Sequence, residues 1–377
     1  MSEFMRLIIA EVVKAHKTQN GVQRLVVTYP NAKGKAIKSE ALRYVELAPI
    51  CEVGDRILIN TTAVDLNLGT GGLSPVLVNL TAIERNGPIA FDDPAPGGGH
   101  IMKLRYTPLQ HEVLSVEEPD SPFHEIMAKA VSLKGTPVIC CELHSQIPLV
   151  AAAVKYKEPD ARIVYCMTDD AALLASFSTL LVQMRKAGLL DASITCGQAF
   201  GGDYEAVNLY SGLLAAVAVC EADVIICSQG PGLVGTATQF GHGGLSQAES
   251  LNAATVLDGV PIATLRVSFT DARQRHQGVS HHTLTALGRA CLAKAVVPFP
   301  ANLPSEQATF MENQLVESGI PQRHEVVKVN FNEPEIDLFG LEVTTMGRTQ
   351  GDDPAFFSAS FAAGIFAAQL LRARQKG

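Results

Sequence analysis

Short segments in which apolar and polar positions alternate fill the first 90 residues. They are rich in β-branched residues and are separated by glycine-containing turns, a pattern typical of half-buried strands. We expect strands at Leu7–Val13, Gln23–Tyr29, Leu42–Leu47, Arg56–Asn60 and Pro75–Ile83. Strands of this number and length predict a small β-barrel of the OB or SH3 type.

Continuous apolar runs separated by longer helical stretches follow from Gly135 onwards. Such runs are typical of parallel strands that are buried on both faces because helices cover the sheet. We expect strands at 137–143, 162–167, 192–196, 223–228, 261–267 and 325–329, and helices at 146–157, 171–187, 204–220, 245–258, 281–294 and from Pro354 onwards. The sequence therefore predicts an α/β fold, a doubly wound, mostly parallel, Rossmann-like sheet preceded by the small N-terminal barrel.

A glycine- and proline-rich segment separates the two patterns. Residues 92–99 read Asp-Asp-Pro-Ala-Pro-Gly-Gly-Gly, a composition typical of a linker. We therefore expect an all-β domain over 1–90, a linker over 91–100 and an α/β domain over 101–377. Charge supports this division, because residues 1–90 hold ten Lys/Arg and eight Asp/Glu (+2), whereas the remainder holds twenty and thirty (−10), for a total of −8.

Composition also narrows the class of partner and the compartment. The net charge of −8 gives no reason to expect nucleic acid or an anionic membrane, and Phe4, Tyr29 and Tyr44 are too few aromatics for base stacking on the barrel. We expect no signal peptide, because Met1-Ser2-Glu3-Phe4 leads into a short strand-like run. No apolar run reaches about 18 residues without charges or Gly/Pro breaks, so we also expect no membrane span; residues 205–220 come closest. The eight cysteines lie mostly in apolar runs, as buried thiols do in a reducing compartment. We expect a cytoplasmic protein.

Polar side chains follow each of the first five predicted strands of the parallel sheet. They include Glu142 and His144 after the first strand, Asp169 after the second and Asp271 after the fifth. The alternative is that Ser145, Asp169 and Asp203 merely cap helices, and each alone is more often a cap than a catalytic residue. Ligands of open α/β sheets bind beyond the carboxyl ends of the strands, so five polar clusters at one edge predict a ligand site there.

Glycines with the spacing G-x-G-x-x-G follow the fourth strand, at Gly230, Gly232 and Gly235. Three further glycines, at 241, 243 and 244, interrupt the stretch where a dinucleotide-binding helix should begin, and no acidic residue ends the next strand, which argues against NAD. The backbone N–H groups of such a loop still suit an anion. The alternative is a flexible loop with glycines at positive φ.

The segment from Arg266 to His282 is the richest in reactive side chains. Its three arginines form a basic island in an acidic domain, which suits a phosphate or carboxylate ligand. Ser280 has the position of an N-cap, so His281 and His282 fall in the first helical turn, where the helix dipole favours neutral imidazole. Adjacent residues do not share a helix face, so we do not expect both histidines to bind a single ion.

Two sharper constellations can be assembled from these residues. A nucleophilic triad would use Ser145 with His281 as base and Asp169 as its partner, although no G-x-S-x-G elbow surrounds the serine. A metal site would have ligand types that suit a divalent ion, although no H-E-x-x-H spacing supports it. Its side chains would be Glu142, His144, Asp169, His276 and His281.

Four separated motifs carry a family resemblance. They are Gly98–Gln110, Gly197–Asn208, Ser228–Gly232 and Gly278–Thr285. Together they resemble the bacterial domain-of-unknown-function family 3866, over nearly the whole chain. The resemblance implies a bacterial cytosolic protein, and it implies neither an activity nor a catalytic residue.

We expect an enzyme, such as a hydrolase or a transferase, that acts on a small anionic metabolite by acid–base or metal-assisted chemistry. Its catalytic residues would be His144, Asp169 and His281. The residues that bind the substrate would be Gly230, Gly232, Gly235, Arg266, Asp271, Arg273 and His282, with Lys103 and Arg105 closing over it. The cofactor question stays open between a divalent metal and none.

Two other functions use the same features. A non-catalytic metabolite-binding or regulatory protein would use the same pocket without turnover. A homo-oligomeric assembly protein would pair through its last helix, although such an apolar stripe is also what an ordinary core helix presents. The stripe comprises Phe356, Phe357, Phe361, Ile365, Phe366 and Leu370. We expect the protein to be a homodimer.

Overall fold

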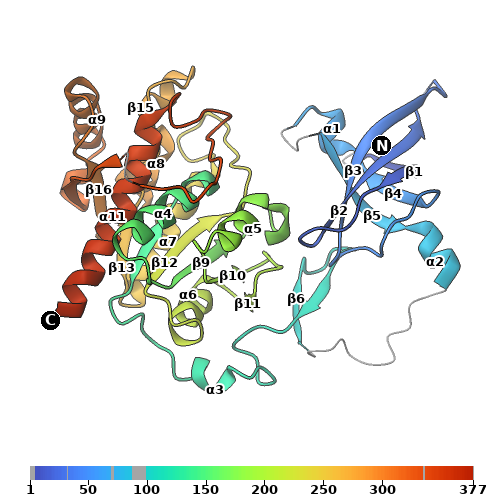
Figure 1. Ribbon diagram of the computed structural model, residues 1–377, viewed down its shortest axis with the longest axis horizontal. Coiled ribbons are helices and arrows are strands. Elements are labelled where there is room, and N and C mark those ends of the chain that lie inside the picture. The colour runs from blue at the N-terminus through green and yellow to red at the C-terminus, as the bar shows by residue number, and fades with distance from the viewer. Residues whose placement is uncertain (1–4, 32, 69–71, 87–98, 334–335, 377) are drawn as a thin grey trace. The chain divides into compact units, whose positions relative to one another are not determined.

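A computed structural model describes residues 5–31, 33–68, 72–86, 99–333 and 336–376 (Figure 1). The chain forms two compact units, Met1–Val113 and Leu114–Gly377, and each is described by itself. Most of the expected linker, residues 91–98, lies outside the described residues.

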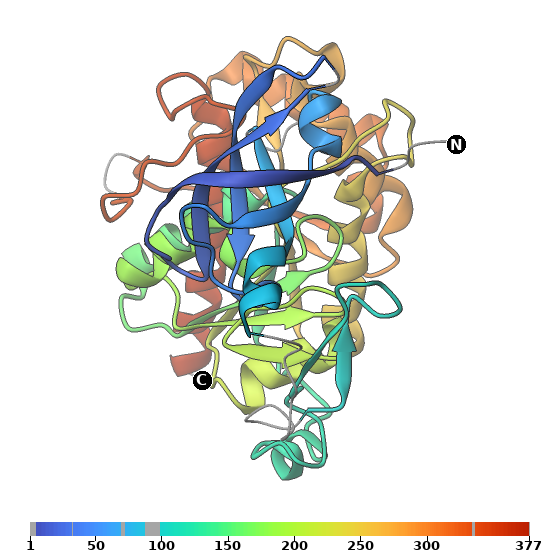
Figure 2. The same ribbon diagram turned by 90° about the vertical axis from the view of Figure 1, so that its right-hand side faces the viewer.

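The N-terminal unit is a closed five-stranded barrel in the order β1-β2-β3-β5-β4. Figure 2 shows its strands crossing one another. Only β3 and β5 are paired in parallel, and the other pairs are antiparallel. The strands are β1 (Leu7–Ala15), β2 (Val22–Pro30), β3 (Ala36–Tyr44), β4 (Arg56–Asn60) and β5 (Leu73–Asn79), with helices α1 (Thr62–Asp65) and α2 (Leu80–Asn86) and a hairpin of β6 (Ile101–Lys103) and β7 (His111–Val113).

Alternation explains the barrel, and the strand boundaries differ most from the expected ones in the third and fifth strands. Along β2, Gln23, Leu25 and Val27 are buried, whereas Arg24 is exposed and Val26 is half-buried. This is the period-2 pattern of a sheet with one buried face. The third strand begins at Ala36 rather than at Leu42. The prediction missed its first half because those residues are mostly exposed and do not form an apolar pattern. The fifth ends at Asn79, where a short helix begins.

The C-terminal unit is built on an eight-stranded sheet in which every pairing is parallel, in the order β11-β10-β9-β12-β8-β13-β16-β17. The strands β8, β9, β10 and β12 are buried throughout, as expected for a sheet covered on both faces. The strands are β8 (Pro137–Cys140), β9 (Ile163–Thr168), β10 (Ala192–Cys196), β11 (Tyr204–Ala206), β12 (Val224–Gln229), β13 (Val260–Ala263), β16 (Val296–Pro300) and β17 (Glu325–Val329), beside a two-stranded ribbon of β14 (Val267–Ser268) and β15 (Gly278–Val279).

Helices cover both faces of this sheet and separate two hydrophobic cores. One core contains α6 and α7, and the other contains α4, α5 and α11. The helices are α3 (His124–Met127), α4 (Ile147–Lys157), α5 (Thr179–Lys186), α6 (Leu209–Ala218), α7 (Ser246–Val256), α8 (His281–Thr285), α9 (Ser305–Glu317), α10 (Ile320–Arg323) and α11 (Pro354–Lys376). The expected doubly wound α/β architecture with a preceding barrel is confirmed.

Strands β8 and β12 form the switch point of the sheet. The chain leaves β8 through α4 toward β9, and it leaves β12 through α7 toward β13 on the other side of β8. Helices α4 and α7 lie in the two cores on opposite faces, so the two connections diverge beyond the carboxyl ends of β8 and β12. This is where ligands bind in open α/β sheets; we call it the β8–β12 switch point.

Helix α11 is long and apolar enough to cross a membrane by length and composition, and it is mostly buried. It packs on α4 in one of the two cores, where Phe356, Phe357, Phe361 and Ile365 are fully or almost fully buried. Four residues of the stripe considered for pairing with a second subunit are therefore packed within the chain, while Phe366 and Leu370 are half-buried, and pairing through this helix stays a prediction. The eight cysteines are also buried and form no disulfide.

Candidate functional site

Glu142 lies at the centre of a polar network at the β8–β12 switch point. It follows β8, and its side chain is completely buried. Its Oε1 accepts a hydrogen bond from Arg266 Nη1 at 2.9 Å and lies 3.3 Å from His282 Nδ1, while Oε2 accepts one from the Thr283 hydroxyl. Burial alone would raise the pKa of this carboxyl, but the charge of Arg266 and the contacts of His282 and Thr283 outweigh burial and lower the pKa to about 2.

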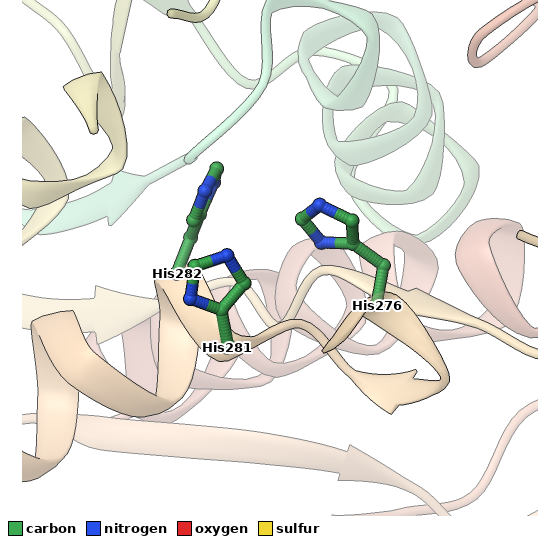
Figure 3. Close-up of side chains that lie close together, drawn as sticks. All are labelled: His276, His281 and His282. Carbon is green, nitrogen blue, oxygen red and sulfur yellow. The ribbon is translucent and has the colours of Figure 1, made fainter. Parts of the chain in front are cut away.

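Four histidines gather beside this carboxylate; we call His242, His276, His281 and His282 the histidine cluster. The His242 ring stacks on His282 with centroids 3.9 Å apart. His276 meets both His281 and His282 with centroids 5.1 Å apart. Figure 3 shows His281 and His282 rising from the start of α8 and His276 from the preceding turn, all toward one side. Four imidazoles from two distant loops therefore share one small volume.

Ser280 caps α8 as the sequence predicts, accepting a hydrogen bond from the backbone N–H of His282. The two histidines that follow were not expected to bind a single ion, because adjacent residues do not share a helix face, yet the structure brings their rings together. Their ring centroids lie 4.3 Å apart, with the rings inclined at 62°. One turn of π-helix, Ala286–Ala290, follows α8 directly, a feature frequent at functional sites.

Burial and neighbouring charges lower the pKa of three members of the histidine cluster, His242, His276 and His281, which favours their neutral form. Burial, followed by Arg266, Arg273 and His282, lowers the pKa of His276 to about 3. Burial and the neighbouring histidines lower the pKa of His281 to about 4, and that of His242 is lowered for the same reasons. From the sequence, the helix dipole was expected to lower the pKa of His281, whereas burial is the largest cause in the structure. Neutral imidazoles are the form that accepts a proton or binds a metal.

His144 joins the network through Gln229. Its Nδ1 lies 3.3 Å from the Gln229 carbonyl oxygen, and the Gln229 amide donates to the Glu142 carbonyl oxygen at 3.0 Å. Its Nε2 lies 2.6 Å from the Ser178 hydroxyl, which also caps α5. The serine that contacts His144 is thus Ser178, whereas the expected triad paired Ser145 with His281. Burial lowers the pKa of His144 to about 4.

Asp169 belongs to a different corner of the sheet edge. Its Oδ2 accepts a hydrogen bond from the backbone N–H of Gln198 at 2.7 Å, in the turn after β10. The carboxylate lies so close to Gly197 that a Cβ there would be 2.3 Å from it. Of the three predicted catalytic residues, the structure therefore joins His144 and His281 to the network around Glu142, while Asp169 holds the β10 turn.

Each glycine of the 230–235 loop is required by a different feature of the local structure. A Cβ at Gly230 would lie 2.3 Å from the Ala172 carbonyl oxygen, and Gly232 has a φ of +103°. Gly235 pairs with His242 in a β-bridge, and its missing Cβ would lie 3.3 Å from His282 Nε2. The loop returns as a hairpin, and α7 begins only at Ser246, so these glycines do not open a helix as a dinucleotide fingerprint does. Anion binding by this loop stays a prediction.

The two predicted anion-binding arginines have carboxylate partners in the protein. Arg266 is paired with Glu142, and Arg273 grips Asp271 through Nε and Nη2 at 2.9 and 2.8 Å. Asp271 is itself buried. Its carboxylate therefore stabilises the loop after β14 through Arg273 and has little surface left for a ligand. Lys103 ends β6 and Arg105 follows it in the N-terminal unit, and their closing over the site stays a prediction.

Sequence reasoning missed His242 and undervalued Glu142 as the centre of the network. His242 sits among glycines 241, 243 and 244, where no periodic pattern marks it, and only the return of the loop brings it to His282. Glu142 was considered only as a metal ligand. Its position directly after an apolar strand is the signal that could have found it. A carboxylate placed there is expected to be buried, and a buried carboxylate needs a cationic partner.

The fold and the site define a two-unit α/β protein with a cluster of histidines at the switch point of a parallel sheet. The chain belongs to the family described as protein of unknown function DUF3866, whose match covers residues 40–364; the resemblance inferred from the motifs is confirmed. No curated protein and no solved structure matches the chain.

Proposed function

We propose that the C-terminal unit is an enzyme that acts on a small anionic metabolite, by acid–base or metal-assisted chemistry, at the β8–β12 switch point. The observation that supports the proposal is the gathering of the histidine cluster beside the buried carboxylate of Glu142. Titratable groups shifted by burial and by specific charged partners are characteristic of catalytic sites.

Three imidazole nitrogens in this cluster are buried without a hydrogen-bond partner. They are both ring nitrogens of His242 and Nε2 of His281. A buried polar atom left unsatisfied costs about 1–3 kcal/mol, so three of them in one place call for an explanation. A bound ligand that supplies the missing hydrogen bonds explains them, and His242 is then the group best placed to exchange a proton with that ligand.

The positive charge next to the cluster favours an anionic ligand. Arg275 is exposed, and its charge contributes to lowering the pKa of His281, which places it close to that ring. Arg266 and Arg273 already hold carboxylates of the protein, so Arg275 is the arginine of this segment that a substrate phosphate or carboxylate would meet.

The test is a turnover screen of the full chain. The protein is incubated with phosphate monoesters, carboxylic esters and lactones, with and without added divalent ions, and products are followed by mass spectrometry. We expect one substrate class to be converted. His242→Gln should lower kcat/KM by about 10²–10⁴-fold, the usual contribution of a general acid or base, and Arg275→Gln should raise KM more than it lowers kcat.

His16→Gln is the matched control, because His16 is an exposed histidine of the N-terminal unit, and its kinetics should equal those of the wild type. Saturable binding of an anion without any turnover would contradict the enzyme hypothesis and favour a non-catalytic metabolite-binding protein. Unchanged kinetics of His242→Gln would move the reaction away from the histidine cluster.

A further inference from the structure

Three members of the histidine cluster have the arrangement of metal ligands. One ring nitrogen from each of His276, His281 and His282 lies within 4.8 Å of those of the other two. Figure 3 shows the three rings around a common space. His242 stacks on the back of this group and is not one of the three.

Two of the three rings have a protein partner on one nitrogen, which leaves the other nitrogen for an ion. His282 presents Nδ1 to the Glu142 carboxylate at 3.3 Å, and His276 presents Nδ1 to the Ser280 hydroxyl at 2.9 Å. A proton on Nδ1 of His282 donates to that carboxylate and leaves Nε2 as the electron-pair donor. Metal-bound histidines almost always have such a carboxylate or hydrogen-bond partner on the second nitrogen. His281 keeps Nε2 buried and without a protein partner.

We propose that His276, His281 and His282 bind one divalent ion of the zinc class and leave its fourth coordination position open. The inference rests on the proposed function for the role of the ion, which would activate water or polarise the anionic substrate in the open position. Glu142 is then a positioning residue, which acts through His282.

The donor set and the spacing agree with such an ion. Imidazole is a preferred ligand of Zn²⁺ and its neighbours Co²⁺, Ni²⁺ and Cu²⁺, and catalytic zinc sites have three protein ligands. Bonds of about 2.0–2.1 Å in a tetrahedral site place the ligand atoms about 3.4 Å apart, so nitrogens that now lie within 4.8 Å of one another need to close by at most about 1.4 Å. Rotation of side chains achieves this without a change of backbone.

Gly235 keeps one approach to the ion clear. A Cβ at this position would lie 3.3 Å from both Cε1 and Nε2 of His282. This is tighter than ordinary van der Waals contact and would push on the ring edge that carries the donor atom. The third glycine of the G-x-G-x-x-G spacing is thus explained by the histidine beside it.

The experiment measures metal binding by the full, tag-free chain after removal of metals with a chelator. Zn²⁺ is titrated by calorimetry, and Co²⁺ is titrated by its visible absorption, which reports the coordination of the ion. We expect one equivalent to bind and the cobalt spectrum to be that of a four-coordinate ion. His281→Gln, a substitution of a partly exposed ring, should weaken binding at least tenfold, while His16→Gln should bind as the wild type does.

Glu142→Gln tests the positioning role, with about 10–100-fold weaker binding expected and an altered cobalt spectrum at saturation. Should this variant fail to fold, Gly235→Ala provides the second test, with a shifted cobalt spectrum and weaker binding. The absence of saturable binding to the wild type, or equal binding by His281→Gln, overturns the metal site. Turnover by metal-free protein would overturn the ion's role and leave the proposed function standing. Metal binding without turnover of any substrate would leave the metal site standing and overturn the proposed function.

Discussion

Asp271 keeps its charge in the fold because arginines surround it. Arg273 grips both carboxylate oxygens, and Arg348 Nη2 lies 3.6 Å from Oδ2. Hydrogen bonding by Arg273 holds the pKa of Asp271 well below its usual range and outweighs burial. The native pKa is thus lower than the unfolded pKa of about 3.9. The carboxylate therefore stabilises the fold above about pH 4, and this stabilisation is lost as the pH falls toward the native pKa.

Asp271→Asn should lower the free energy of unfolding at pH 7 by about 1–3 kcal/mol, the range for hydrogen bonds to a charged group. The difference from the wild type should shrink as the pH falls below about 4. Urea unfolding at pH 7 and at pH 3 measures both values. Asp160→Asn is the control, since this carboxylate is exposed, and should match the wild type at both pH values. A difference that stays constant with pH would contradict the charge-based account.

Residue types predicted part of the site, and the rest needed contacts between distant segments. Ser280 was predicted as a cap because capping is local, set by residues two positions apart. Arg266 looked free to hold an anion, but its partner Glu142 is 124 positions away in the sequence. A single sequence gives the charge of an arginine, and the fold decides whether that charge is already neutralised.

At the scale of elements, the close packing of α11 against α4 depends on small residues. Gly364 lies where α11 faces α4, and a Cβ there would be 2.3 Å from the Val150 carbonyl oxygen and 2.7 Å from the Ala153 Cβ. Both atoms belong to the backbone or to the base of a side chain, so rotation cannot relieve the clash. The alanines around the contact show the same requirement, since Ala151, Ala152 and Ala363 are completely buried.

Gly364→Ala tests this packing, because two effects of opposite sign compete. Alanine is favoured over glycine in a helix interior by about 1 kcal/mol, whereas overpacking a tight core costs about 1–3 kcal/mol or more. We expect the clash with backbone to dominate and the midpoint of thermal unfolding to fall. Gly351→Ala is the control, because its new Cβ would have only an ordinary contact at 3.8 Å. Equal or higher stability of Gly364→Ala would show that the two helices separate easily.

At the scale of the whole molecule, periodicity predicted the architecture, and weak periodicity accounts for the omissions. The strand at 192–196 and the one at 325–329 were predicted to the residue. Strand β16 was missed because Pro298 and Pro300 interrupt its apolar run, and proline normally argues against a strand. The helix expected over 171–187 is only α5, Thr179–Lys186, since polar residues at 168–170 begin a loop rather than a helix.

Each unit has a hydrophobic core of its own, which bears on independent folding. The barrel core draws on residues such as Leu25 and Ile57, all before residue 80, and both cores of the sheet draw on residues after Leu114. Separate cores are what allow a domain to fold alone. We therefore expect a fragment over 114–377 to fold with a single cooperative thermal transition and to bind Zn²⁺ as the full chain does.

A second fragment over 101–377 locates the boundary between the units. It adds the β6–β7 hairpin, which belongs to the N-terminal unit Met1–Val113. Because the added residues contribute to neither core of the sheet, the two fragments should unfold at the same midpoint by circular dichroism. Gly364→Ala should lower that midpoint equally in both fragments, since distant, independent sites are additive. A clearly higher midpoint for 101–377 would assign the hairpin to the α/β unit and move the boundary back toward the segment expected from composition.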